Sequence, residues 1–462
     1  MFDELPDKEE VAMDALMERA LGELDALRKN PSFDKYRRNR ERYYLNVAFP
    51  PTNLQRPITV DDRRLISEFN NSKRTALYLH IPFCSYLCTF CHYYKEINSP
   101  AQVVSEYVAA LMKELRLHAA RLADHSIASI YFGGGTPGYL EPTQIAELFR
   151  FIRENFKLEK DIEVTFEIDP THATPERLEA LVVGGANRLS IGVQSFDDSI
   201  LKSTNRRYTV AEALAAIARA KDLPFRSVNV DLMFGLIDQT LDHWKKDLSV
   251  VEELVPSAVT VYYQRFREGT AVHKGLPRQI HRYSSEQELT LMSLMMDLLM
   301  EQLGYTAPVV DYFVREQANG HKFDFQVWGR PQVFNLVGVG ASAYSYNGEY
   351  QYSNFKTLEE YVAYMCDNDD LPLSRCYRLS RDEQMRRNLF LGLKVGIPYD
   401  YWGAAFRSEL RDDFGAELQA LERDGVIEEK DQGVHLTKLG RLFADEVGQH
   451  FARLDGPLKQ SA

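Results

Sequence analysis

Between Thr75 and about Arg267 the chain alternates short apolar runs with longer segments in which apolar residues recur every three or four positions. The short runs predict buried strands at Leu77–Ile81, Ser129–Phe132, Glu163–Glu167, Arg188–Val193, Ser227–Met233 and Ala258–Tyr263. The longer segments predict helices at Gln102–Ala123, Glu141–Asn155, Pro175–Gly184, Val210–Ala220 and Leu241–Glu253. Strands that alternate with helices predict a parallel α/β sheet, which binds ligands at the carboxyl ends of its strands.

The pattern changes on both sides of this region. Residues 1–74 predict an arm with one helix, Glu9–Lys29, followed by extended chain. After a further predicted helix, Ser284–Leu303, the stretch Phe334–Tyr346 predicts another strand. From about Leu379 helices precede a two-stranded turn and a last helix, Lys438–Phe451. We therefore predict three parts: an N-terminal arm (1–74), a catalytic α/β domain (75–375) and a small winged-helix-like domain (376–462).

Three of the five cysteines follow the first predicted strand with the spacing Cys-x3-Cys-x2-Cys: Cys84, Cys88 and Cys91. Three thiolates on one loop can bind three irons of a 4Fe-4S cluster and leave the fourth iron open for a ligand. A structural zinc site remains an alternative, although such sites normally use four ligands. A disulfide is a second alternative, but it would leave one thiol over.

The motif YLHIPFC and the aromatic Phe90 before the third cysteine resemble the radical S-adenosylmethionine (SAM) superfamily, in its branch of oxygen-independent coproporphyrinogen oxidases and their relatives. The resemblance implies a partial (βα)6 barrel and a 4Fe-4S cluster on Cys84, Cys88 and Cys91 whose open iron binds SAM. It also implies a SAM pocket formed by Tyr78, His80, Phe90, Gly134, Gly135, Thr136, Glu167, Gln194, Arg206, Asp231 and Met233. Asp231 could instead be a buried paired acid, and the arginine could be the adjacent Arg207.

Two departures from the family pattern decide which reaction we predict. Coproporphyrinogen oxidases carry a further cysteine two positions after the third cluster ligand, where this chain has Tyr93. The related heme chaperones carry a His-Asn pair ahead of Tyr-Trp, whereas HKFDFQVW keeps His321 and Trp328 without that spacing. These departures favour the class C radical SAM methyltransferases and cyclopropane-forming enzymes, which use two SAM molecules. The alternatives are a tetrapyrrole-modifying oxidase and a heme-binding chaperone.

In the favoured reaction a methyl or methylene group is transferred to an sp2 carbon of an aromatic or heterocyclic small molecule. We predict His92, Tyr93 and Gln264 beside the second SAM and the substrate, with His92 as a proton carrier because its usual pKa lies near neutrality. Simple packing of His92 and Tyr93 over the cluster is the alternative. A reductant such as flavodoxin or ferredoxin would supply the electron.

Composition and charge limit the partners and the cellular location that we expect. The formal net charge of −12 argues against a nucleic-acid partner, because binding phosphates needs a basic surface. No apolar run approaches the ~20 residues that span a membrane, and the acidic start MFDELPDKEE lacks the features of a signal peptide. We therefore predict a cytoplasmic protein, whose reducing surroundings suit thiolate ligands and leave Cys366 and Cys376 as plain thiols.

Overall fold

The computed structural model describes residues 13–38, 49–67, 72–266, 270–272, 274, 281–315 and 320–452. Six parallel strands form the centre of its main sheet, and each pairs with the next one along the chain. They are β2 (Arg74–Ile81), β5 (Ser126–Gly134), β6 (Leu158–Ile168), β7 (Arg188–Gln194), β8 (Ser227–Phe234) and β9 (Ala258–Tyr263). All six predicted strands are present, so the predicted parallel α/β architecture is confirmed.

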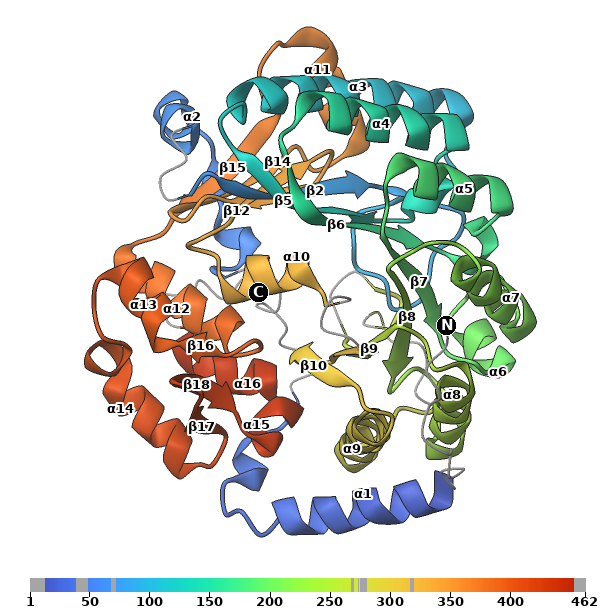
Figure 1. The fold of residues 1–462 in the computed structure, drawn as a ribbon, viewed down its shortest axis with the longest axis vertical. Coiled ribbons are helices and arrows are strands. Elements are labelled where there is room, and N and C mark those ends of the chain that lie inside the picture. Colours follow the sequence, from blue (N-terminus) through green and yellow to red (C-terminus); the bar gives the residue numbers. More distant parts are fainter. Residues whose placement is uncertain are drawn as a thin grey trace.

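Helices cover the outer face of this curved sheet, as Figure 1 shows. They are α3 (Ala101–Arg121), α4 (Pro142–Asn155), α5 (Pro175–Gly184), α6 (Asp198–Ser203), α7 (Val210–Lys221) and α8 (Leu241–Leu254). Side chains at their first turns explain where several begin. The Thr209 and Thr240 hydroxyls accept from backbone N–H groups inside α7 and α8, which would otherwise lack partners.

Further strands extend the sheet at both edges. On the β2 side, β12 (Asn335–Val339) pairs with β2 and is parallel to it. Four strands that are antiparallel to their neighbours come next: β13 (Tyr344–Tyr346), β14 (Tyr350–Asn354), β15 (Leu373–Arg378) and β1 (Arg56–Pro57). Beyond β9 follow β11 (Tyr312–Val314) and β10 (Thr306–Val309). The strand predicted within Phe334–Tyr346 is therefore two antiparallel strands, β12 and β13, joined by a turn.

One short segment crosses the inner side of the sheet. It consists of α10 (Lys322–Asp324) and the π-helical turn η6 (Phe325–Gly329). The Ser129 hydroxyl donates to Gln326 Oε1 at 2.6 Å, and the Glu163 carboxylate accepts from the backbone N–H groups of Lys322 and Phe323. These contacts fasten the segment to β5 and β6, so it forms the floor of the partial barrel.

The N-terminal helix α1 (Met13–Leu27) packs on α9 (Glu286–Gln302), and both lie at the lower edge of Figure 1. Residues 9–12 of the helix predicted at Glu9–Lys29 lie outside the described residues. Two other helices lie in the upper part of Figure 1: α2 (Val60–Ser67) packs against β14 and β15 through Ile66, and α11 (Leu358–Asp367) packs on α3. Within the described ranges, no helix is both long and apolar enough to cross a bilayer.

The C-terminal part is a separate layer of helices with a three-stranded sheet (Figure 1). Its elements are α12 (Arg381–Gly392), β16 (Ile397–Pro398), α13 (Tyr399–Phe406), α14 (Leu410–Arg423), β17 (Ile427–Lys430) and β18 (Gly433–Leu436). Our prediction of a single last helix is wrong, because two helices, α15 (Lys438–Leu442) and α16 (Ala444–Gly448), occupy this region. They meet at Phe443, whose φ of −126° and ψ of 35° are not helical. The Phe443 ring packs edge-on against Phe33, 5.9 Å between centroids, and this contact accompanies the break. The domain boundaries at 74 and 375 stay predictions.

Candidate active site

The three motif cysteines lie on a loop directly after β2, and all three line one large cavity of about 700 Å³. Cys84 is buried, Cys88 and Cys91 are partly exposed, and none forms a disulfide. The glycine turn after β5 holds this loop, because Gly135 N–H donates to Ile81 O at 2.9 Å and Thr136 N–H to Phe83 O at 2.8 Å. The disulfide alternative is therefore excluded in this structure.

Close packing against β2 and the loop after it explains the glycines of that turn. A Cβ atom on Gly135 would lie 2.8 Å from Phe83 O, and one on Gly134 would meet the His80 ring. The close approach that requires glycine is therefore to the cysteine loop itself. Gly134, Gly135 and Thr136 also line the cavity, so their predicted contact with SAM stays a prediction.

The donor set fits a 4Fe-4S cluster better than a single metal ion. No three His, Cys, Asp or Glu side chains in the described part of the chain are grouped closely enough to hold one ion. In a cubane cluster each thiolate binds a different iron, so the sulfurs need not converge on one point. Burial raises the pKa of the Cys84 thiol to about 12, so a thiolate here needs the positive charge that bound iron would supply.

Arg206 joins the cysteine loop to the strand ends. Its guanidinium donates to Cys88 Sγ at 3.3 Å, to Asp169 Oδ2 at 2.9 Å and to Tyr208 Oη at 2.9 Å. Arg207, by contrast, is exposed and does not line the cavity. We call Cys84, Cys88, Cys91 and Arg206 the cysteine end of the cavity. The predicted contact between Arg206 and a SAM carboxylate stays a prediction, since the guanidinium already binds Asp169.

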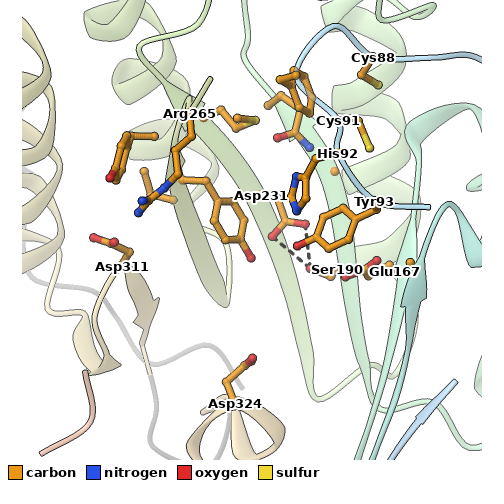
Figure 2. Close-up of a pocket in the computed structure, with 18 of the residues that line it drawn as sticks. Cys88, Cys91, His92, Tyr93, Glu167, Ser190, Asp231, Arg265, Asp311 and Asp324 are labelled. Carbon is orange, nitrogen blue, oxygen red and sulfur yellow. Dashed lines mark hydrogen bonds between the residues drawn. The ribbon is translucent and has the colours of Figure 1, made fainter. Parts of the chain in front are cut away.

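Two carboxylates, one on β6 and one on β8, face the cavity beside the cysteine end, as Figure 2 shows. Glu167 accepts from Tyr131 Oη at 2.6 Å, and burial raises its pKa to about 7. Asp231 accepts from Ser190 Oγ at 3.1 Å and from Asn229 Nδ2 at 2.7 Å, and burial raises its pKa to about 6. Both side chains can accept hydrogen bonds from ligand hydroxyl or amino groups.

The other residues that the resemblance implied for the SAM pocket also reach this cavity. Tyr78 and His80 lie side by side, with 3.2 Å between Tyr78 Oη and His80 Nδ1. Phe90 packs against the small apolar cluster that contains Met233. Gln194 ends β7 with a φ of 72° and lines the cavity. The structure thus brings all eleven residues together, while their contacts with SAM stay predictions.

The three residues that we predicted beside the substrate have different positions. His92 and Tyr93 line the cavity with their rings 4.2 Å apart between centroids, and Tyr93 is half exposed. Gln264 does not line the cavity: it is fully buried, and its Oε1 accepts from the backbone N–H of Ile237 at 3.1 Å. Its chain neighbours Tyr263 and Arg265 do line the cavity, so the predicted place of Gln264 beside the substrate stays a prediction.

The sequence prediction missed the opposite end of the cavity, which Figure 2 shows across from the cysteines at Arg265 and Asp311. Four cations line it, and we call them the cationic end: Arg38, Arg265, Lys394 and Arg441. They come from four segments far apart in the chain. The position of Arg265, just after a predicted strand, was the one available signal.

Aromatic rings form the walls between the two ends. Tyr131 lies 5.0 Å from Phe323 and 6.1 Å from Tyr78 between ring centroids. On the facing side Tyr262 and Tyr312 pack edge-on at 6.2 Å. Asp324, on the floor segment, also faces the space between them (Figure 2). Flat apolar walls with a few charged groups are typical of sites for ring-shaped organic ligands.

Comparisons with known proteins agree with this architecture. The family model described as Radical SAM superfamily matches residues 78–251, and the one described as HemN C-terminal domain matches residues 379–443. An oxygen-independent coproporphyrinogen III oxidase from Salmonella typhimurium is 31% identical over 403 residues, which are 84% of this chain and 86% of that protein. The heme chaperone HemW from Bacillus subtilis is 28% identical, and the matched part makes up 97% of that protein.

A solved structure with the same fold is that of coproporphyrinogen III oxidase (HemN) from Escherichia coli. It superposes with a TM-score of 0.76 at 27% identity, over 88% of this chain and 96% of that one. These findings overturn the predicted methyltransferase or cyclopropane-forming activity, because the relatives that match 80% or more of the chain are oxidases and a heme chaperone. The missing fourth cysteine at Tyr93 had been given too much weight. The chain belongs to the radical SAM superfamily, in the family of oxygen-independent coproporphyrinogen III oxidases and HemW heme chaperones.

Proposed function

We propose that this radical SAM enzyme oxidises a tetrapyrrole, as an oxygen-independent coproporphyrinogen III oxidase does. The observation that carries the proposal is a single cavity that runs from the cysteine end, between aromatic walls, to the cationic end. A porphyrinogen offers pyrrole rings to the walls and carboxylates to the cations. The similarity of the chain to oxidases over more than four fifths of their length supports the same substrate class.

Oxidation of a propionate side chain to a vinyl group releases carbon dioxide and removes one hydrogen atom and one electron. When bound, the cluster and SAM together supply the one-electron chemistry that removes the hydrogen atom. The remaining electron passes to a one-electron acceptor. A flavodoxin or ferredoxin as the initial reductant, and a cytoplasmic location, remain predictions.

The side chains of this protein bind and orient the reactants, and they exclude water from the site. Arg206 holds the Cys88 sulfur and so fixes the loop that carries the cluster. Glu167 and Asp231 offer acceptors to the nucleotide, and the rings of Tyr78, Tyr131 and Phe323 exclude water from the space beside them. Holding both reactants in one dry site supplies the proximity that hydrogen transfer needs.

The heme-chaperone alternative is less well supported by the local geometry. His321, which we had compared with the histidine of the chaperone motif, is buried, and Arg188 Nη2 donates to its Nδ1 at 2.8 Å. Burial, together with the charge of Arg188, holds the pKa of His321 well below its usual range. Its ring is therefore engaged with the protein and does not line the cavity.

The test is anaerobic incubation of the reconstituted protein with reductant, SAM and coproporphyrinogen III. We expect 5'-deoxyadenosine, carbon dioxide and a tetrapyrrole in which propionates have become vinyl groups. Formation of S-adenosylhomocysteine with a methylated product would contradict the proposal. Oxidation does not itself require a second SAM, so the predicted count of two stays open to measurement by quantifying SAM bound per chain.

A further inference from the structure

The cationic end of the cavity is assembled at the junction between the barrel and the C-terminal part. Arg265 follows β9, and Arg38 ends the described N-terminal segment. Lys394 follows α12, and Arg441 lies in α15. The carboxylates that line the same end are Asp311, Asp445 and Glu446. Four cationic and three carboxylate side chains therefore line this wall, and Arg38 is already paired with Glu286 at 2.8 Å.

Arg441 makes no hydrogen bond or salt bridge through its guanidinium with any residue that the structure describes. The side chain is partly buried and lines the cavity. Asp297 and Asp311 feel the charge of Arg441, but neither forms a salt bridge or hydrogen bond with it among the described residues. Its fork of N–H donors matches a carboxylate. Arg441 is thus a donor that the protein leaves available to a ligand.

A second donor lies on the same wall. The Tyr263 hydroxyl is buried and has no hydrogen-bond partner among the described residues. Its ring lies between two cations, 4.0 Å from the Arg265 guanidinium and 5.7 Å from that of Arg38. Burial raises the pKa of Tyr263 well above its usual value, so the hydroxyl keeps its proton and can donate it.

Asp445 shows that this wall already binds a carboxylate. Its Oδ1 lies 2.5 Å from Lys394 Nζ, and its Oδ2 accepts from Arg265 Nη2. Both cations and the carboxylate are about nine-tenths buried. Burial alone would raise the pKa of Asp445, but Lys394 and Arg265 lower it, so the carboxylate is ionised. Asp445 therefore occupies Arg265 and Lys394 and leaves Arg441 free.

Two buried carboxyl groups near Arg441, Asp297 and Asp311, both have a pKa raised by burial, so they neutralise its charge only in part. Burial, together with the nearby Asp297, raises the pKa of Asp311 to about 7. A substantial fraction of this side chain is therefore uncharged near neutral pH. The charge of Arg441 remains available at the pH at which a propionate side chain is fully ionised.

We propose that Arg441 and the Tyr263 hydroxyl anchor one carboxylate of the substrate, while Asp445 holds Arg265 and Lys394 in place beside them. This inference rests on the proposed function, because it names the part of the tetrapyrrole that this wall recognises. Anchoring a propionate at the cationic end fixes how the macrocycle lies relative to the cysteine end. Arg441 and Tyr263 are therefore specificity-determining residues.

The test is fluorescence-monitored binding of coproporphyrin III, which carries four propionates and needs no turnover. Its tetramethyl ester has the same macrocycle without the charges. We expect the wild-type protein to prefer the free acid. The Arg441→Gln variant should bind the free acid about ten- to a hundredfold more weakly, since a hydrogen bond to a charged group is lost. Its affinity for the ester should not change.

Two other variants sharpen the result. Tyr263→Phe removes only a hydroxyl and should weaken binding of the free acid by about threefold to tenfold. Arg423→Gln removes the same charge from an exposed position on α14, outside the cavity, and should bind like the wild type. Thermal unfolding of each variant checks that it folds.

The two possible failures are distinguishable. If folded Arg441→Gln binds the free acid as tightly as Arg423→Gln does, the carboxylate assignment is wrong, while the proposed function stands. If the wild-type protein binds neither porphyrin, the tetrapyrrole substrate is wrong, and the assignment of this wall is overturned with it.

Discussion

The two ends of the cavity differ in how the chain builds them. The cysteine end comes from one loop of eight residues, Cys84 to Cys91, plus Arg206. The cationic end comes from four segments that begin near Arg38 and finish near Arg441. The chemistry of a cofactor can be encoded locally because one loop holds it. Recognition of a large substrate needs walls from several parts of the fold.

From this comparison we expect cluster binding at the cysteine end to be lost completely when one of its cysteines is replaced. Cys88→Ala removes one of three cluster ligands, so we expect no bound iron–sulfur cluster and no SAM cleavage. Iron analysis and chromatography of 5'-deoxyadenosine measure both. Cys366→Ala, at an exposed thiol far from the motif in sequence, is the matched control and should behave as the wild type. Retained SAM cleavage in Cys88→Ala would refute the ligand assignment.

Arg206 should be the next most sensitive position. Arg206→Ala leaves Asp169, which is nearly fully buried, without its guanidinium partner. Breaking a buried ion pair in this way costs about 3–5 kcal/mol of folding free energy. The shift of the thermal and urea unfolding midpoints measures this loss under anaerobic conditions.

The adjacent Arg207 provides the control, because it is exposed. Arg207→Ala should change stability by less than about 0.5 kcal/mol. Equal effects of the two variants would mean that the ion pair at the cysteine end does not hold the loop as described.

Gly135 tests how tightly the turn after β5 packs on the cysteine loop. In Gly135→Ala the new methyl group would meet backbone atoms at 2.8 Å, which cannot move aside cheaply. We expect a loss of about 1–3 kcal/mol and less bound iron. Gly22→Ala places the same group in open space on helix α1 and should stabilise the protein slightly. If Gly135→Ala changed neither the stability nor the amount of bound iron, the turn would not constrain the loop.

At the cationic end we expect a change in how stability depends on pH. Asp311 has a pKa of about 7, which is above the usual aspartate value, so the folded state keeps a proton that the unfolded state loses. Stability should therefore fall as pH rises from about 4 to about 7. The groups that face Asp311 are Asp297, Arg441, Asp445 and Lys394.

Asp311→Asn removes this titration and tolerates the φ of 67° at that position. The unfolding midpoint of the variant should exceed that of the wild type more at about pH 8 than at about pH 5. An identical pH slope in both proteins would contradict the raised pKa. Activity at the two pH values is a secondary readout, because Asp311 also neighbours the proposed anchor Arg441.

Much of the fold could be predicted because its signal is local. The periodic apolar runs located all six barrel strands, and α5 and β9 have the predicted bounds. The last helix was predicted as one, whereas the structure breaks it at Phe443, whose ring contacts the N-terminal Phe33. Sequence periodicity does not contain such a contact between the two ends of the chain.

The same distinction applies to the site. The cysteines, Glu167 on β6 and Asp231 on β8 were located in the cavity from family resemblance, while their roles stay predictions. Arg441 and Lys394 were not located in this way, because nothing near them in sequence marks a cavity. Gln264 is buried although both of its chain neighbours line the cavity, and the sequence alone does not show this difference. The predicted reaction was wrong because a single residue, Tyr93, was used to exclude the oxidases.

The most direct test of the central claim follows one hydrogen atom. Coproporphyrinogen III carrying deuterium on the propionate carbons next to the pyrrole rings is incubated anaerobically with the reconstituted protein, SAM and reductant. We expect deuterium in 5'-deoxyadenosine and vinyl groups in the tetrapyrrole. 5'-Deoxyadenosine without deuterium, together with a tetrapyrrole that keeps all its propionates, would contradict the account.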